Sequence, residues 1–262
     1  MRGRVALVTG GSRGLGLALA RELVRQGARV AICSREDTEL AKARAFLERS
    51  GAKVVTLVCD VTDQGEVDAM LDRLRERLGP VDVLINNAGT IRGGPMETMT
   101  LEDYRRALRS HFSGPLHTTL GVLPDMRRRR AGRIVNIASV GGKIAVPHDL
   151  PYRPTKFALV GFSDGLRAAL ARDNIYVTTV NPGLRRTASP RNARPEGQDG
   201  KEFAWYSISD SLPLLTMSAE RAARCIVEAC RYGDPELVTP LALKLRAAVT
   251  NNQPATAHDH PI

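Results

Sequence analysis

The sequence has 262 residues, 43% of them hydrophobic, and a formal net charge of +10 at pH 7. A chain of this length and apolar content can bury a substantial core, which argues against disorder over most of its length. We expect one domain over residues 1–250, followed by a polar, proline-containing and flexible tail at 251–262.

Hydropathy and cysteine usage bear on the cellular compartment. No run of about eighteen apolar residues is present, so we expect no membrane span. The first nine residues, Met1 to Thr9, read as a charged start followed by a strand, so we expect no cleaved signal. The four cysteines follow none of the close spacings of metal-binding or redox motifs: Cys33, Cys59, Cys225 and Cys230. We therefore expect free thiols, no metal site and a cytoplasmic location.

The positive charge raises the question of a nucleic-acid partner. Its densest run, Arg127–Arg130, lies between a helical stretch and a strand. No aromatic residues alternate with these arginines, as a protein that binds single strands would need. We interpret the run as a solvated helix end or loop and expect no nucleic-acid partner.

Strand-like apolar runs alternate with helical periodicity along the chain. The expected elements are, in order, Val5–Thr9, Gly14–Gln26, Arg29–Cys33, Asp37–Ser50, Val54–Cys59, Asp63–Leu78, Val81–Asn86, Leu101–Met126, Arg133–Ala138, Pro151–Ala171 and Ile175–Val180. Strand followed by helix implies parallel strands with right-handed crossovers. The expected fold is α/β, a doubly wound parallel sheet of the Rossmann type with helices on both faces.

The periodicity stops after Asn181-Pro182-Gly183. The segment from Leu184 to about Pro213 is rich in Arg, Pro, Gly and Asp, and its length predicts a lid-like insertion at about 184–215. Helical patterning resumes over Ala219–Arg231, and Leu237–Val238 is expected to begin a last edge strand.

A glycine-rich turn follows the first strand and opens a helix. Glycine lets backbone N–H groups and the helix N-terminus approach a pyrophosphate, because a Cβ would hold the phosphate away. Such a turn can also be purely structural, but its position between an apolar strand and a helix favours a dinucleotide. The predicted cofactor-binding residues are Gly10, Ser12, Arg13, Gly14, Leu15 and Gly16.

The second strand ends at Ser34, which Arg35 follows. An NAD enzyme generally has Asp or Glu here, to accept hydrogen bonds from the ribose 2′-OH. A guanidinium suits a 2′-phosphate instead, and Arg13 can close from the other side. Ser34 and Arg35 therefore favour NADP(H) over NAD(H). The alternative is that Arg35 only faces solvent and that Glu36 or Asp37 reads the ribose.

Tyr152 and Lys156 are four residues apart in a helical segment and so lie on one face of it. A lysine ammonium about 4 Å from a phenol supplies the roughly 4 kcal/mol that lowers a tyrosine pKa from about 10 to about 7. Such pairs are often only exposed neighbours on a helix. Ser139, however, ends the fifth strand, and ligands bind at the carboxyl ends of such strands. Its hydroxyl can hold a substrate oxygen beside Tyr152.

Taken together, these motifs resemble the short-chain dehydrogenase/reductase family over residues 5–187. The resemblance rests on Thr9-Gly10-x-x-x-Gly14-x-Gly16, Asp60-Val61, Asn86-Asn87-Ala88-Gly89, Ser139, Tyr152-x-x-x-Lys156 and Asn181-Pro182-Gly183. It implies a sheet of seven parallel strands and, because family members are often dimers or tetramers, a homodimer or homotetramer. The further cofactor-binding residues that it implies are Asp60, Val61, Asn87, Ala88, Gly89, Tyr152, Lys156, Pro182, Gly183 and Thr187.

The resemblance also implies catalytic roles. Tyr152 would be the acid/base, Ser139 the orienting donor, and Lys156 the residue that binds the nicotinamide ribose and lowers the tyrosine pKa. The family usually has Asn at the position of His111, where it holds a water that links the lysine to bulk solvent. His111 is thus either a working substitute or a buried histidine satisfied by backbone groups. Under the first interpretation, activity falls as His111 is protonated and loses its acceptor.

The function that follows is hydride transfer between NADP(H) and a small carbonyl or secondary alcohol substrate, with Tyr152 handling the proton. One alternative is a 3-oxoacyl reductase acting on a carrier-linked substrate, which would use the positive surface. An alternative of another class is a catalytically silent, nucleotide-binding regulatory protein. The retention of Ser139, Tyr152 and Lys156 argues against this last alternative, because a binding module has no need of the phenol.

Overall fold

The computed structural model describes residues 1–90, 96–139, 150–182, 185–186 and 217–238. Its main sheet has seven strands in the order β3-β2-β1-β4-β5-β6-β9, and every pairing between them is parallel. The strands are β1 (Val5–Thr9), β2 (Arg29–Ser34), β3 (Val54–Val58), β4 (Val83–Asn86), β5 (Gly132–Ile137), β6 (Ile175–Asn181) and β9 (Glu236–Val238). The predicted doubly wound sheet is confirmed. Its order reverses between β1 and β4, which is where such sheets bind ligands.

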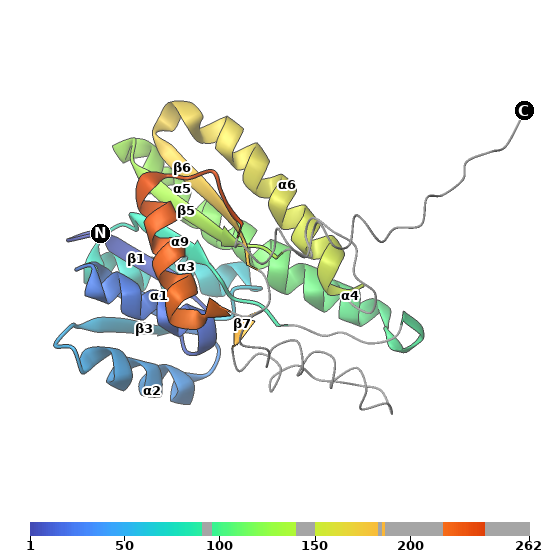
Figure 1. Cartoon of the computed structure of the whole chain (residues 1–262), viewed down its shortest axis with the longest axis horizontal. Coiled ribbons are helices and arrows are strands. Elements are labelled where there is room, and N and C mark those ends of the chain that lie inside the picture. Colours follow the sequence, from blue (N-terminus) through green and yellow to red (C-terminus); the bar gives the residue numbers. More distant parts are fainter. Residues whose placement is uncertain (91–95, 140–149, 183–184, 187–216, 239–262) are drawn as a thin grey trace, which may run out of the picture.

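Helices cover both faces of the sheet (Figure 1). One core cluster packs α1 (Gly14–Arg25), α2 (Asp37–Glu48) and α9 (Ala219–Tyr232) onto the strands. The other packs α3 (Gln64–Leu78), α5 (Gly114–Arg129) and α6 (Tyr152–Leu170) onto the opposite face. The central strands are largely apolar because parallel strands are buried on both faces.

The predicted helical region at Leu101–Met126 is not one regular helix. It consists of α4 (Leu101–Leu108), a π-helical turn at Arg109–Ser113 and then α5. Pro115 has no N–H and therefore cannot make the i→i−4 hydrogen bond to the His111 carbonyl. Directly before it, the N–H of Gly114 bonds to the Arg109 carbonyl, five residues back, which is the π-helical pattern. The sequence prediction did not foresee this π-helical turn. The other predicted boundaries agree with the structure to within two residues.

The basic run forms the last turn and the C-cap of α5, which is one of its two predicted forms, a helix end or a loop. Arg127 pairs with Asp173 at 3.1 Å, and Arg128 pairs with Asp125 at 2.8 Å. Arg130 caps the helix in the left-handed region, with φ of 50°, and its guanidinium donates to the Arg172 carbonyl at 2.7 Å. Cations at a helix C-terminus interact favourably with the helix dipole, and here they also tie α5 to neighbouring segments.

The predicted insertion begins and ends in a short parallel pair, β7 (Arg185–Arg186) with β8 (Met217–Ser218), which the sequence analysis did not foresee. The insertion between them, at 187–216, lies outside the described residues, as do Gly183, Thr187 and the predicted tail at 251–262. Among the helices that are described, none is long and apolar enough to cross a membrane.

Candidate functional site

The glycine-rich turn lies at the carboxyl end of β1 and is fastened to the end of β4. The Asn87 side chain donates to the carbonyl oxygens of Thr9 and Gly10 at 3.0 and 3.2 Å. The Thr9 hydroxyl oxygen accepts from the backbone N–H groups of Asn87 and Ala88, each at 3.0 Å. A Cβ on Gly16 would lie 2.6 Å from Asn87 Nδ2. Glycine at position 16 is therefore needed for the close approach of α1 to this junction.

The N-terminus of α1 is open toward the cofactor position. Arg13, at the N-cap, makes no side-chain capping bond, and the first turn holds no acidic residue. Gly14 has a φ of +55°, and a Cβ built on it would meet nothing within 4 Å among the described residues. N–H groups of an uncapped helix end attract an anion. The turn thus fits the pyrophosphate of a dinucleotide. Ser12 beside it is half-buried, whereas the Leu15 side chain packs into the core.

The ends of β2 and β3 bring Arg35 and Asp60 together, with Arg35 Nη1 3.7 Å from Asp60 Oδ2. The Arg35 side chain is 61% exposed. Ser34 is half-buried, and its hydroxyl oxygen accepts from the Glu36 N–H at 3.2 Å. Val61 is buried, and its carbonyl lies 3.1 Å from His117 Nδ1. An exposed pair at this distance is weak, so the Arg35 guanidinium can turn toward a phosphate at small cost.

Lys156 is buried and fastened to the last residue of β5. Its Nζ donates to the Ile137 carbonyl at 2.8 Å and lies 5.4 Å from the centroid of the Tyr152 ring. Ser139 follows Ile137 by two residues, so the end of β5 carries both the lysine contact and the serine. Tyr152 and Ser139 are both half-buried. The tertiary structure therefore brings the tyrosine–lysine pair on α6 to the strand end that carries Ser139.

His111 lies against the same tyrosine from the π-helical turn. It is 2% exposed, and its ring meets the Tyr152 ring edge-on, with centroids 5.0 Å apart. Its Nε2 lies 2.6 Å from the Thr90 carbonyl oxygen, so Nε2 carries the hydrogen and donates it. Nδ1 is then an acceptor, and within the described part of the chain it has no hydrogen-bond partner.

The pKa of His111 corrects one expectation from the sequence. Burial of the ring, and to a lesser extent the positive charge of Lys156, lower this pKa to about 3, although the bond to the Thr90 carbonyl opposes the shift. The imidazole is thus neutral at physiological pH. A loss of activity from protonation of His111 in the ordinary pH range, as expected above, does not follow from this structure.

Gly89 makes room for the histidine. A Cβ at this position would lie 2.6 Å from His111 Nδ1 and closer still to Cε1, which is too near for any side chain. The resemblance placed Gly89 at the cofactor wall, but its role beside His111 was missed. The sequence held no signal for this role, because the two residues are distant along the chain.

The sequence analysis also missed a line of buried polar side chains behind the site. Asn86 of β4 and Asn136 of β5 are neighbours in the sheet, and Asn86 Nδ2 donates to Asn136 Oδ1 at 2.9 Å. Thr118 of α5 donates to Asn86 Oδ1 at 2.7 Å. Ser163 of α6 accepts from Asn136 Nδ2 at 2.9 Å. The available signal was asparagine at or near the ends of two mostly apolar strands.

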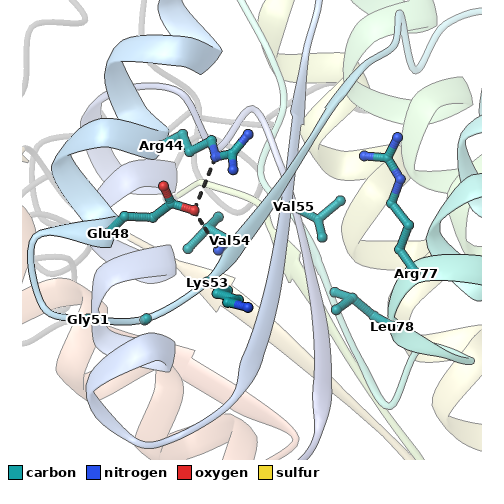
Figure 2. Close-up of a pocket in the computed structure, with 9 residues that line it drawn as sticks. Arg44, Glu48, Gly51, Lys53, Val54, Val55, Arg77 and Leu78 are labelled. Atoms are coloured by element: carbon teal, nitrogen blue, oxygen red, sulfur yellow. Dashed lines mark hydrogen bonds and ion pairs between the residues drawn. The ribbon is translucent and has the colours of Figure 1, made fainter.

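A shallow groove lies at the other end of the sheet and takes no part in this arrangement (Figure 2). It is lined by Arg44, Glu48, Gly51, Lys53 and Arg77 around the start of β3, the edge strand. Ligands of doubly wound sheets bind at the carboxyl ends of the strands. We therefore place the functional site at the ends of β1, β4, β5 and β6, where Pro182 is buried directly after β6. The described residues hold no group of three or more His, Cys, Asp or Glu side chains suited to a metal ion.

The fold and this arrangement of side chains are those of an oxidoreductase that uses a dinucleotide. A family model described as short chain dehydrogenase matches residues 4–198. A Streptomyces coelicolor protein named as a candidate ketoacyl reductase is 39% identical over 216 residues, which cover 80% of this chain and 83% of that protein. The chain therefore belongs to the short-chain dehydrogenase family.

Solved structures agree with this assignment. A variant of actinorhodin polyketide ketoreductase, crystallised with NADPH, is 33% identical with a TM-score of 0.82, and the match covers 91% of this chain and 97% of that one. A short-chain dehydrogenase/reductase from Burkholderia phymatum in complex with NAD has a TM-score of 0.87 at 24% identity, covering 94% and 92%. The second likeness supports the fold alone.

Proposed function

We propose that this oxidoreductase reduces a carbonyl group with NADPH and that Tyr152 delivers the proton to the substrate oxygen. The observation that carries the proposal is the hydrogen bond of Lys156 to the Ile137 carbonyl, because it holds the ammonium beside the Tyr152 ring at the end of β5. A cation held there stabilises a phenolate, which makes the phenol a usable proton donor.

The other residues have supporting roles in this proposal. Ser139 donates its hydroxyl hydrogen to the substrate oxygen and orients it beside Tyr152. An ammonium has three donors, so the bond of Lys156 to Ile137 is compatible with further bonds to the ribose hydroxyls. His111 is a neutral acceptor whose Nδ1 anchors a water beside Lys156. NADP(H), when bound, supplies or accepts the hydride.

The residues at the strand ends would hold the cofactor. The pyrophosphate would lie on the turn at Gly10–Gly16 and the N-terminus of α1, with Gly183 and Thr187 at the nicotinamide end. Arg35, together with Arg13, would bind the 2′-phosphate, and the absence of a carboxylate at Ser34 supports NADPH over NADH. The ketoreductase above was also crystallised with NADPH.

A 3-oxoacyl group on a carrier is the second candidate substrate. It is favoured by the names of two relatives, the ketoacyl reductase candidate and the polyketide ketoreductase. The test is a panel of ketones, aldehydes and alcohols, each assayed with NADPH, NADH and their oxidised forms, together with free and carrier-linked 3-oxoacyl thioesters. Faster turnover of the carrier-linked substrate supports this candidate. Cofactor binding without hydride transfer to any compound would instead support the silent regulatory protein.

We also infer a homodimer or homotetramer. Leu108, Leu120 and Phe157 on α4, α5 and α6 are large apolar residues that are 47%, 51% and 49% exposed. A second copy of the chain would bury them. The four cysteines are free, which agrees with a cytoplasmic location. One domain over residues 1–250 remains part of this proposal, whereas nearly all of the predicted lid at 184–215 lies outside the described residues. Light scattering measures the oligomeric state, and a monomer would contradict the inference.

A further inference from the structure

Helix α6 is fastened to β5 at two points. Near its start, Lys156 Nζ donates to the Ile137 carbonyl at 2.8 Å. Two turns later, Ser163 Oγ accepts from Asn136 Nδ2 at 2.9 Å. Asn136 and Ile137 are consecutive, so one short piece of strand contacts the helix twice. Because a helix is stiff over this length, the second contact limits how far Lys156 can slide along β5.

Asn136 is itself held from both sides. Its Oδ1 accepts from Asn86 Nδ2 at 2.9 Å, while its Nδ2 donates to Ser163. The Ser163 hydroxyl hydrogen goes to the Leu159 carbonyl at 2.7 Å, which leaves a lone pair for Asn136. Asn86, Asn136 and Ser163 are between 0% and 3% exposed. The loss of a hydrogen bond between buried groups is costly, so this series of hydrogen bonds has one preferred arrangement.

The line of polar groups continues to α5. Thr118 Oγ1 lies 2.7 Å from Asn86 Oδ1 and 3.0 Å from the Gly114 carbonyl oxygen. Gly114 directly follows the π-helical turn that carries His111. The same line therefore reaches from α6, which carries Tyr152 and Lys156, to the segment that places His111 against the Tyr152 ring.

We propose that Asn136 is a positioning residue for the proton transfer. Through Ser163 it holds α6 at the register where Lys156 lies beside Tyr152, and through Asn86 and Thr118 it fixes α5 behind His111. Asn136 is fully buried, so its proposed role is to position other residues and not to contact the substrate. The inference rests on the proposed role of Tyr152, because only a misplaced proton donor would alter the pH dependence of the reaction.

Ser163→Ala removes the acceptor for Asn136 and leaves the strand unchanged. The measurement is kcat and KM from pH 5 to 10 with NADPH and the best ketone of the panel. We expect kcat to fall about ten- to a hundredfold, with KM for the ketone within about twofold, since small misplacements of reacting groups have effects of this size. The pH profile should shift by about half a unit or more. Ser163→Thr keeps the hydroxyl and should restore both.

Leu40→Ala serves as the matched control, because Leu40 is fully buried on α2, on the other face of the sheet. It should lower the thermal midpoint but leave kcat and the pH profile unchanged. If Ser163→Ala does not fold, Ser163→Cys replaces it, since the thiol has a similar shape and is a weak acceptor. A parental kcat and profile in the folded variant, or the same losses in Leu40→Ala, would overturn the proposal.

Tyr152→Phe separates the two hypotheses. If it loses turnover while Ser163→Ala matches the parent, the positioning role of Asn136 is wrong and the proposed function stands. If Tyr152→Phe keeps turnover, the proposed function is wrong, and the role of Asn136 is overturned with it.

Discussion

The imidazole of His111 stands perpendicular to the Tyr152 ring, with centroids 5.0 Å apart and planes at 90°. This edge-to-face contact joins a residue on the π-helical turn to the first residue of α6. Such pairs contribute about 0.5–1.5 kcal/mol beyond burial and restrict the orientation of both rings. The contact thus helps to fix the orientation of the Tyr152 ring, the proposed proton donor. It makes His111 part of the site, although the low pKa of His111 keeps the imidazole uncharged.

Tyr152→Phe should lower kcat at least about a hundredfold, because it removes the exchangeable proton and keeps the ring. The dissociation constant for NADPH should change little. Steady-state kinetics and cofactor titration measure the two quantities. Tyr176→Phe is the control, since Tyr176 is 41% exposed at the start of β6 and stacks on Arg133. Near-parental turnover in the Tyr152 variant would remove the phenol from the mechanism.

The neutral His111 should make the folded protein sensitive to mild acid. Its pKa is lowered from 6.5 to about 3, so below pH 6.5 the unfolded chain takes up a proton that the folded protein does not. Stability is therefore lost as the pH falls through this window. Between pH 7 and 5 the loss from this one group is about 2 kcal/mol.

Urea unfolding at pH 7 and pH 5 tests this stability effect. We compare how much the free energy of unfolding falls from pH 7 to pH 5 in the parent and in His111→Asn. This fall should be smaller by about 2 kcal/mol in His111→Asn. The comparison of differences removes the contribution of all other titrating groups. Equal pH dependence in both proteins would mean that the folded-state pKa of His111 is near its ordinary value.

Replacement of His111 should also separate a water-anchoring role from simple packing. His111→Asn keeps a hydrogen-bonding side chain and should retain most of the activity. His111→Leu keeps bulk but offers no acceptor, and kcat should fall about tenfold or more if a water on Nδ1 serves Lys156. Neither variant should gain or lose a limb of the pH–rate profile between pH 5 and 9, because the pKa of His111 is about 3. Equal rates in the parent and both variants would leave His111 as a packing residue only.

Gly89→Ala should be destabilising because its Cβ would lie 2.6 Å from His111 Nδ1. Overpacking of this kind costs about 1–3 kcal/mol. The cost should largely disappear in a His111→Ala background, which removes the ring, and thermal unfolding of the four proteins gives the coupling. Gly161→Ala is the control and should be neutral or stabilising, since a Cβ at Gly161 meets nothing within 4 Å among the described residues. An unchanged cost without the ring would place the strain elsewhere.

Arg35→Asp should weaken NADPH binding about ten- to a hundredfold and leave NADH binding equal or improved. A charge-assisted hydrogen bond is worth roughly 1.5–3 kcal/mol, and the new carboxylate would also repel the 2′-phosphate. Arg49→Asp makes the same change in net charge at the other end of α2 and should have little effect. Fluorescence titration measures the dissociation constants of the parent and both variants for NADPH and NADH. Equal affinities of the parent protein for NADPH and NADH would contradict the assignment of Arg35.

Local sequence determined the elements and the residues at their ends. Alternating apolar runs and helical periodicity gave β1 to β6 and α1, because each pattern depends on neighbours a few residues apart. The i, i+4 spacing placed Tyr152 and Lys156 on one helix face for the same reason. The glycines after β1 were readable because a tight turn at a helix start demands them locally.

Only the tertiary structure decided which of these residues meet. The pairing of Asn86 with Asn136 depends on β4 lying beside β5, and the slot that Gly89 provides for His111 depends on how the π-helical turn packs onto the end of β4. Periodicity along one segment carries no information about contacts between segments that are distant in sequence. The low pKa of His111 could not be predicted from the sequence for the same reason, since the main cause of the shift is burial by distant segments.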